Sequence, residues 1–263
     1  MPTPTQSENA ERFLALHHRT GAFLMPNPFD GGSARLFERL GYEALATSSG
    51  ASAATLGKRD GELTRDEVMA HIRLVSAATT LPVSADLENG FGEEPPQVAE
   101  TINLAAESGA VGGSIEDYSG DPQRPFYDLD LATRRIDAAV RAARALPFPF
   151  TLTARCENFL RGHADLEDTI ARLQAYESVG ADVLFAPALP DLDAVRKVAA
   201  SLKRPFSFMV GIPGKSFTVA DLAAAGVRRI SFGGSMYQVA MKALGRVAKQ
   251  TLEDGRFGWL EGN

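Results

Sequence analysis

The chain has 263 residues, of which 44% are hydrophobic and 23% are charged, so it can bury a large core and does not belong to the disordered class. Its formal net charge is −6 with both signs interspersed, whereas a nucleic-acid surface needs a concentrated basic face. The single cysteine, Cys156, excludes an internal disulfide framework and a cysteine-rich zinc site.

The sequence has no feature of a membrane or secreted protein. No apolar run approaches the roughly 20 residues of a spanning helix. The first residues, MPTPTQSENAERF, combine neither the basic nor the apolar region of a signal peptide. We therefore expect a soluble, cytoplasmic protein with no membrane and no nucleic-acid partner.

Short apolar segments, typical of buried parallel strands, alternate with amphipathic helical segments along the chain. The expected strands are Ala22–Pro26, Ala44–Thr47, Val83–Asp86, Gly112–Glu116, Phe150–Arg155, Val183–Ala186, Phe206–Val210 and Arg229–Phe232. The expected helices are Glu8–His18, Ala34–Leu40 with Ser33 as its N-cap, a helix from the Thr64 capping box to Ala78, Pro96–Glu107, Leu131–Arg144, Leu166–Val179, Leu192–Leu202, Val219–Ala225 and Met236–Leu252.

Eight such strand–helix units predict an α/β fold, a (β/α)8 TIM barrel that forms one domain over residues 1–263. The alternative, an open doubly wound sheet, lacks its usual G-x-G-x-x-G signature near the start of the chain. The extra helix before the first strand is expected to cover the bottom of the barrel.

Carboxylates follow two neighbouring strands where a barrel collects its functional groups, at the C-terminal strand ends. Asp86 and Glu88 stand at i and i+2, which points both the same way if the backbone is extended, and Glu116 ends the next strand. Oxygen ligands without a histidine cluster favour a hard cation, Mg²⁺ or Mn²⁺. The alternative is that these residues are ordinary solvated loop acids.

Other strand ends carry groups that could bind a carboxylate. Arg155 could clamp one bidentately, or pair with Glu157 as a structural ion pair. The small residues of Ser48–Ala51 could present backbone N–H groups to an oxyanion, or simply form a tight turn. Neither serine there has an evident His/Asp relay, so a serine hydrolase is not expected. Cys156 is expected to be buried packing.

Several strand-end segments together resemble the isocitrate lyase / phosphoenolpyruvate mutase superfamily. They are Asn27-Pro28-Phe29-Asp30, Thr47-Ser48-Ser49-Gly50, Leu56-Gly57-Lys58-Arg59-Asp60, the run from Pro82 to Gly92, Ile115-Glu116-Asp117 and Ala154-Arg155. The likeness covers nearly the whole chain in order.

The resemblance implies a Mg²⁺-dependent enzyme that acts on a small 2-oxo or 2-hydroxy carboxylate through an enolate of pyruvate or a homologue. It implies Asp86 as a direct metal ligand, with Glu88 and Glu116 binding directly or through water, and Asp60 in support. For the substrate it implies contacts with Asn27, Ser49, Gly50, Ala51 and Arg155. It also implies a homo-oligomer, a dimer or tetramer, in which the C-terminal helix is exchanged between subunits, whereas the alternative is a helix packed on its own barrel.

Differences between this sequence and the usual superfamily motifs narrow the range of expected activities. The usual D-x-D becomes Asp86-Leu87-Glu88, and the K-K-C-G-H loop of the isocitrate-type lyases is replaced by the segment from Tyr118 to Tyr127, which has no cysteine, histidine or lysine. We therefore expect a carbon–carbon lyase of an oxo-acid-acting subgroup, with water, Tyr127 or Tyr118 supplying the proton. The alternatives are a P–C bond hydrolase or mutase on a phosphonopyruvate-like substrate, and a barrel that binds ligands without turnover.

Overall fold

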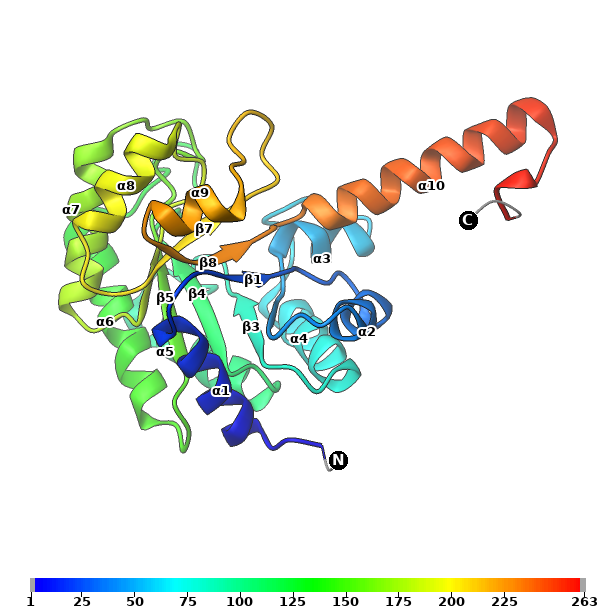
Figure 1. Cartoon of the computed structure of the whole chain (residues 1–263). Helices are drawn as coiled ribbons and strands as arrows, with labels where there is room; N and C mark the ends of the chain where they lie inside the picture. The colour runs from blue at the N-terminus through cyan, green and yellow to red at the C-terminus, as the bar shows by residue number, and fades with distance from the viewer. Residues whose placement is uncertain (1–2, 261–263) are drawn as a thin grey trace.

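The computed structural model describes residues 3–260, and it has eight parallel strands that form the wall of a barrel (Figure 1). The strands are β1 (Phe23–Met25), β2 (Leu45–Ala46), β3 (Val83–Asp86), β4 (Gly112–Glu116), β5 (Thr151–Arg155), β6 (Val183–Phe185), β7 (Phe206–Met209) and β8 (Val227–Ser231). The predicted strands are all present, and β3 and β4 have the expected bounds.

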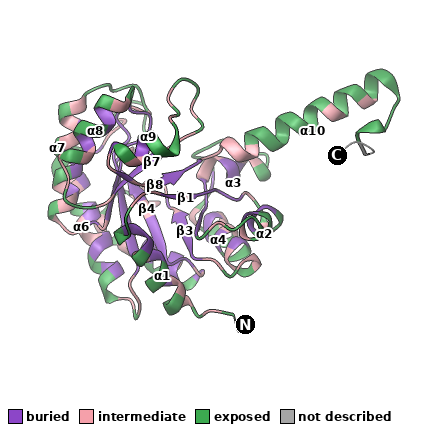
Figure 2. Cartoon of the chain, in the orientation of Figure 1, coloured by how far each residue is buried: buried purple, intermediate pink, exposed green. Residues whose placement is uncertain are grey.

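Helices precede and follow the strands, and most of them cover the outside of the barrel. They are α1 (Gln6–His18), α2 (Gly31–Arg39), α3 (Ser49–Thr55), α4 (Arg65–Ala78), α5 (Pro95–Glu107), α6 (Leu129–Ala145), α7 (Leu166–Ser178), α8 (Leu192–Ala200), α9 (Val219–Ala224) and α10 (Ser235–Asp254), with a short 3-10 turn at Gly258–Leu260. Figure 2 shows buried residues on the strands and on the helix faces turned toward them.

The sheet runs in the order β1-β8-β7-β6-β5-β4-β3-β2, so all neighbours except β1 and β2 are paired as strands. Between these two, the backbone N–H of Ala46 donates to the carbonyl of Pro26 at 3.1 Å. The result is a nearly closed (β/α)8 barrel, as the sequence predicts, and its C-terminal strand ends meet at one rim.

Helix α1 lies against the end of the barrel opposite that rim, as expected. Its Phe13 is fully buried, and a Cβ atom added at Gly112 of β4 would lie 2.7 Å from the Phe13 ring. Glycine at this position therefore lets an aromatic side chain of α1 fill the bottom of the barrel.

Two local predictions were wrong. Helix α2 begins three residues earlier than expected, because the Asp30 side chain, and not that of Ser33, accepts from the first turn and forms the N-cap. Helix α3 was not expected: Ser48 is its N-cap, and the segment Ser49–Thr55 contains mainly small residues without an apolar stripe.

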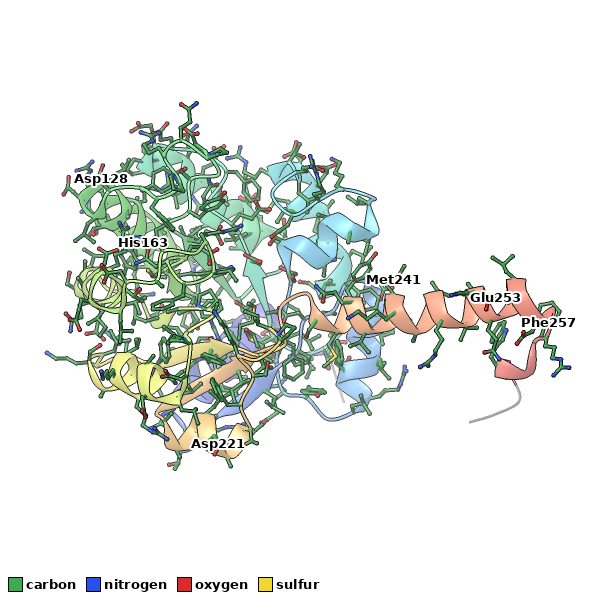
Figure 3. The ribbon with its side chains drawn as sticks, turned by 90° about the horizontal axis from the view of Figure 1, so that it is seen from above. Asp128, His163, Asp221, Met241, Glu253 and Phe257 are labelled. Atoms are coloured by element: carbon green, nitrogen blue, oxygen red, sulfur yellow. The ribbon has the colours of Figure 1, made fainter. Side chains whose placement is uncertain are left out.

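Helix α10 leaves the barrel after β8 and projects away from it, which Figure 1 and Figure 3 both show. None of its residues is buried in the single chain, and apolar side chains along it are exposed, among them Val239, Leu244 and Leu252. Among the described residues, no helix has both the length and the apolar character needed to cross a lipid bilayer.

Candidate active site

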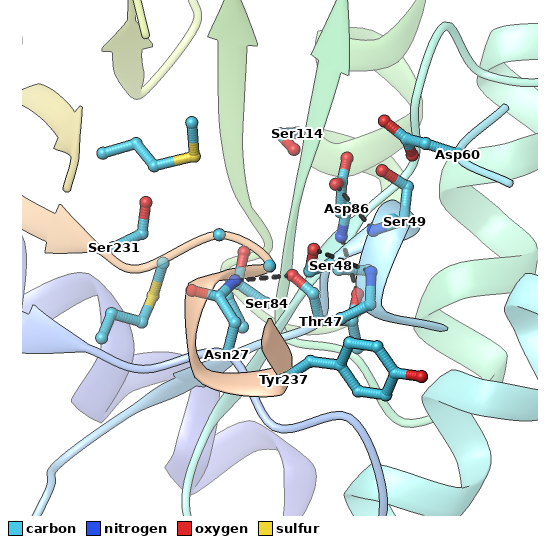
Figure 4. A pocket seen from close by; sticks show the side chains of 18 of the residues that line it. Asn27, Thr47, Ser48, Ser49, Asp60, Ser84, Asp86, Ser114, Ser231 and Tyr237 are labelled. Carbon is cyan, nitrogen blue, oxygen red and sulfur yellow. Dashed lines mark hydrogen bonds between the residues drawn. The ribbon is translucent and has the colours of Figure 1, made fainter. Parts of the chain in front are cut away.

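A cavity of about 400 Å³ opens at the C-terminal ends of the strands (Figure 4). Most of the residues that the sequence predicts for the substrate or metal site line it, namely Asn27, Ser49, Gly50, Ala51, Asp60, Asp86 and Arg155. The predicted residues Glu88 and Glu116 line a second cavity of about 410 Å³, which shares Ser49, Asp60 and Arg155 with the first. The two cavities therefore adjoin at these three residues.

Asp86 is held at the end of β3 by its neighbours on β2 and α3. Its backbone N–H donates to Thr47 Oγ1 at 2.9 Å, and the Ser49 backbone N–H donates to its carboxylate at 3.0 Å. The Ala51 N–H donates to Ser48 Oγ at 3.4 Å. Two of the predicted oxyanion-binding amides are therefore already engaged, so a ligand oxygen must share or replace these contacts.

Arg155 lies at the centre of the acidic side chains. Its Nε donates to Glu157 at 2.5 Å, and its Nη1 lies 3.4 Å from Glu116 and 3.8 Å from Asp86. Burial alone would lower the pKa of Arg155, but Glu157, Glu116 and Asp86 together raise it. The guanidinium is therefore a permanent positive charge at the cavity wall, and both readings of Arg155 hold in part, because it pairs with Glu157 and also faces the cavity.

The carboxyl groups of Glu88 and Glu116 are held in surroundings that favour their neutral forms. Burial, followed by repulsion from Asp86 and Asp60, raises the pKa of Glu88 to about 8. Burial and the nearby Glu157 raise the pKa of Glu116 well above its ordinary value. Two neighbouring carboxyl groups with raised pKa values are typical of a functional site.

Glu88 reaches the site by a different backbone path from the one predicted. Strand β3 ends at Asp86, and Glu88 has a left-handed φ of 48°, so the extended i, i+2 relation does not apply. A side-chain residue in this conformation is strained, and such strain is common at ligand sites.

The acidic residues suit a hard divalent cation by their chemistry, although they are not preassembled around one. Glu88 Oε1 is buried with no hydrogen-bond partner, which leaves an oxygen ligand free. Within residues 3–260, however, no three acidic, histidine or cysteine side chains are clustered closely enough to form a metal cage. Asp86, Glu88 and Glu116 therefore remain predicted ligands whose side chains would have to reorient.

Asp60 and Asn27 occupy the edges of the first cavity. The carboxyl carbon of Asp60 would lie 3.4 Å from a Cβ atom at Gly50, so the glycine allows Asp60 to approach the start of α3. The Asn27 amide donates to the Thr47 carbonyl at 2.8 Å and accepts from the Phe232 N–H at 2.9 Å. Asn27 thus connects the ends of β1, β2 and β8 by hydrogen bonds. Its contact with the substrate remains a prediction.

The two tyrosines predicted as proton donors lie in different surroundings. Tyr118 lines the second cavity, together with Glu116 and Arg161. Tyr127 is buried, its ring lies under the Arg135 guanidinium, and its hydroxyl accepts from Asn89 at 3.3 Å. Tyr127 is not among the residues that line either cavity, so its catalytic role remains a prediction.

Sequence reasoning missed Arg161 as a site residue. Its Nε donates to Glu157 at 2.9 Å, its Nη2 lies 3.7 Å from Glu116, and its guanidinium stacks on the Tyr118 ring at 3.9 Å. The signal that could have found it is its position six residues after Arg155, in the loop that follows β5. Cys156 is buried, as expected, and burial raises the pKa of its thiol.

Together, these features define an α/β barrel with acidic side chains and arginines around two adjoining cavities at its C-terminal rim. The chain belongs to the phosphoenolpyruvate phosphomutase family, which matches residues 13–252. The predicted superfamily is thereby confirmed, and curated relatives in it are named as lyases.

Three similar proteins illustrate the range of the family. The chain is 32% identical to an oxaloacetate decarboxylase of Paraburkholderia xenovorans over 241 residues, which cover 89% of this chain and 79% of the relative. A crystal structure from Burkholderia cenocepacia J2315, described only provisionally as a lyase/mutase, is 52% identical with a TM-score of 0.95 and covers 98% of this chain and 92% of that one. A structure of oxaloacetate acetylhydrolase with its product oxalate is 25% identical with a TM-score of 0.87. The match covers 95% of this chain and 89% of that one.

Proposed function

We propose that this enzyme is a Mg²⁺-dependent lyase that cleaves a carbon–carbon bond of a small 2-oxo or 2-hydroxy (di)carboxylate through an enolate of pyruvate or a homologue. The observation that carries the proposal is the position of Arg155, whose guanidinium faces Asp86 and Glu116 at a cavity on the catalytic rim of the barrel. The named activities of similar proteins, oxaloacetate decarboxylase and oxaloacetate acetylhydrolase, support an oxo-acid substrate.

The residues that would hold the cation are Asp86, with Glu88 and Glu116 directly or through water. When bound, Mg²⁺ (or Mn²⁺) supplies a Lewis acid where negative charge develops on the substrate oxygens. It also removes the need for Glu88 and Glu116 to stay neutral, because a nearby cation favours the ionised form of a carboxyl group. The unpartnered Glu88 Oε1 is the oxygen best placed to gain from this change.

The chain's own groups orient the substrate and stabilise its charge. Arg155 provides a fixed positive charge that needs no reorganisation during the reaction, and a planar donor that matches a carboxylate. The turn from Ser49 to Ala51 adds backbone N–H groups close to Asp86. Tyr118 lines the second cavity with Glu116, and this supports Tyr118, ahead of Tyr127, as the proton donor to the enolate carbon.

A product assay tests the proposal. The purified enzyme is incubated with oxaloacetate, substituted malates and phosphonopyruvate, with Mg²⁺ and then with excess EDTA, while pyruvate (or its homologue) and phosphate are measured. We expect 2-oxo acid release from at least one carboxylate substrate, reduced at least 100-fold by EDTA. Equal rates with and without metal would refute the mechanism, and phosphate release from phosphonopyruvate alone would establish the P–C hydrolase instead.

A further inference from the structure

The inner part of the first cavity is lined by polar side chains that have no polar partner. Ser84, Ser114 and Ser231 line it from β3, β4 and β8, and Figure 4 shows them around the same hollow as Asp86 and Ser49. Among residues 3–260, no side-chain hydrogen bond engages their hydroxyl groups. On β5, the hydroxyls of Thr151 and Thr153 are also buried without a partner. The barrel interior is therefore unusually polar for a packed core.

Arg229 of β8 lines the same cavity and is only 3% exposed. Its Nε donates to Ser207 Oγ at 3.0 Å, and its Nη1 lies 3.4 Å from Nε2 of His17. No ion pair of Arg229 with a carboxylate occurs within the described part of the chain. Burial lowers the pKa of Arg229 to about 9, so the side chain still carries its charge at neutral pH.

The two arginines on the strands that line the first cavity differ in their partners. Three carboxylates surround Arg155, whereas Arg229 contacts the Ser207 hydroxyl and His17. The histidine, His17, cannot supply negative charge. A buried charge without a counter-charge is costly, and water can solvate the guanidinium but cannot neutralise it. An anion in the cavity would supply the counter-charge that Arg229 lacks.

We propose that Arg229, Ser84, Ser114 and Ser231 form an anion-binding subsite at the floor of the cavity, with the size and hydrogen-bonding character to hold a carboxylate group. One guanidinium and three hydroxyls offer the planar and the rotatable donors that carboxylate oxygens accept. Two sources could supply the anion: the far carboxylate of the substrate, or a free small anion.

The position of the subsite defines the substrate that would use it, an extension that rests on the proposed function. Ser84 precedes Asp86 by two residues of β3, so it lies about 7 Å deeper in the barrel. A 2-oxo dicarboxylate of about five or six carbons would span this length from the rim. The cavity volume of about 400 Å³ also lies in the range of pockets for ligands larger than a four-carbon acid.

The first experiment does not depend on the proposed function. Crystals of the metal-free protein are soaked in sodium bromide, and anomalous scattering locates the bromide ions. We expect a bromide ion in contact with the Arg229 guanidinium and the serine hydroxyls in the wild type. That ion should be absent from a Ser114→Ala/Ser231→Ala variant and from Arg229→Met. A cavity that contains only water in the wild type would overturn the subsite.

The second experiment identifies the source of the anion. Calorimetry with Mg²⁺ compares 2-oxoglutarate and 2-oxoadipate with the monoacids 2-oxopentanoate and 2-oxohexanoate, and with oxalate. We expect the wild type to bind a diacid at least tenfold more tightly than the monoacid of equal length. The serine double variant should lose this preference while its oxalate affinity changes less than twofold. Ser76→Ala, which removes another buried hydroxyl without a partner from α4, outside the cavity, is the matched control and should keep the preference.

Each pattern of results has one meaning. Bromide binding with diacid preference supports the substrate carboxylate as the occupant, and bromide binding without that preference assigns the subsite to a free anion. If bromide binds but oxalate does not bind with Mg²⁺, the proposed function fails while the subsite stands. Because Arg229→Met removes a long buried side chain and could prevent folding, the serine variant decides the result in that case.

Discussion

Glu157 is fully buried between Arg155 and Arg161, and it fixes the orientation of Arg155. It accepts from Arg155 Nε on one oxygen and from Arg161 Nε on the other, while its backbone N–H donates to Asp117 at 2.9 Å. Arg155 is thus held with its Nη groups toward Glu116 and Asp86. Such preorganisation is what allows a fixed charge to stabilise an enolate without moving.

Replacing Arg155 by lysine tests this role, because the charge is kept while the planar guanidinium and its Nε bond to Glu157 are lost. We expect kcat/KM with the best substrate to fall roughly 100-fold, the scale of losing one oriented donor to a developing oxyanion. Arg134→Lys on the exposed face of α6 is the control and should retain full activity. Unchanged kinetics in Arg155→Lys would show that Arg155 serves only as a structural ion pair.

The buried His17, at the bottom of the barrel, makes the stability of the folded protein depend on pH. Burial, followed by the neighbouring charges of Arg229 and His18, lowers the pKa of His17 from 6.5 to about 3, although the bond to the Phe13 carbonyl partly opposes this. The folded protein therefore keeps His17 neutral below pH 6.5, where the unfolded chain takes up a proton. The stability that is present in full above pH 6.5 is lost progressively as the pH falls toward 3.

At pH 5 this effect should cost about 2 kcal/mol of the free energy of unfolding relative to pH 7.5. Urea denaturation at both pH values measures it in the wild type and in His17→Gln, which removes the titrating group and should show a loss smaller by about that amount. His18→Gln changes the exposed neighbour and should behave like the wild type. An equal loss in His17→Gln would mean that other groups cause the acid sensitivity.

At the scale of elements, the loop between β4 and α6 makes several contacts within itself. The Ser119 backbone N–H donates to the Pro125 carbonyl at 2.8 Å, and Tyr118 pairs with Phe126 in an antiparallel bridge. These bonds hold Tyr118 at the second cavity, while Tyr127 packs inside the protein. The loop therefore places Tyr118 at a cavity and Tyr127 in the packed interior.

Matched phenylalanine variants distinguish the two tyrosines. We expect Tyr118→Phe to lower kcat about 10- to 100-fold with little change in stability, because a proton donor at the cavity is lost. Tyr127→Phe should lower the free energy of unfolding by about 1 kcal/mol, the value of one hydrogen bond, and leave kcat nearly intact. The reverse pattern, measured by steady-state kinetics and thermal unfolding, would identify Tyr127 as the donor.

Strands and long helices could be predicted because their apolar patterns are regular, and the capping box at Thr64 marks the start of α4. Helix α3 could not be predicted, because its seven small residues carry no periodic apolar pattern. The candidate carboxylates could be proposed from sequence because they stand at or just after strand ends. The polar floor of the cavity was missed, because Ser84, Ser114 and Arg229 lie within three different strands. Only the inward alternation of side chains around a barrel brings them together.

The whole molecule is a barrel with one projecting helix, α10, whose exposed apolar residues include Val239 and Leu244 (Figure 3). Exposed apolar surface of this kind is typical of an interface. The homo-oligomer with an exchanged C-terminal helix, which the superfamily resemblance implies, remains a prediction.

The central claim is that the rim of this barrel binds a divalent cation and an oxo acid together. A crystal structure with Mg²⁺ and oxalate tests it most directly. We expect the ion on Asp86, with Glu88 and Glu116 as direct or water-mediated ligands, and oxalate between the ion, Arg155 and the turn from Ser49 to Ala51. A structure at saturating Mg²⁺ and oxalate with no ion bound at the rim and no oxalate against Arg155 would contradict the account.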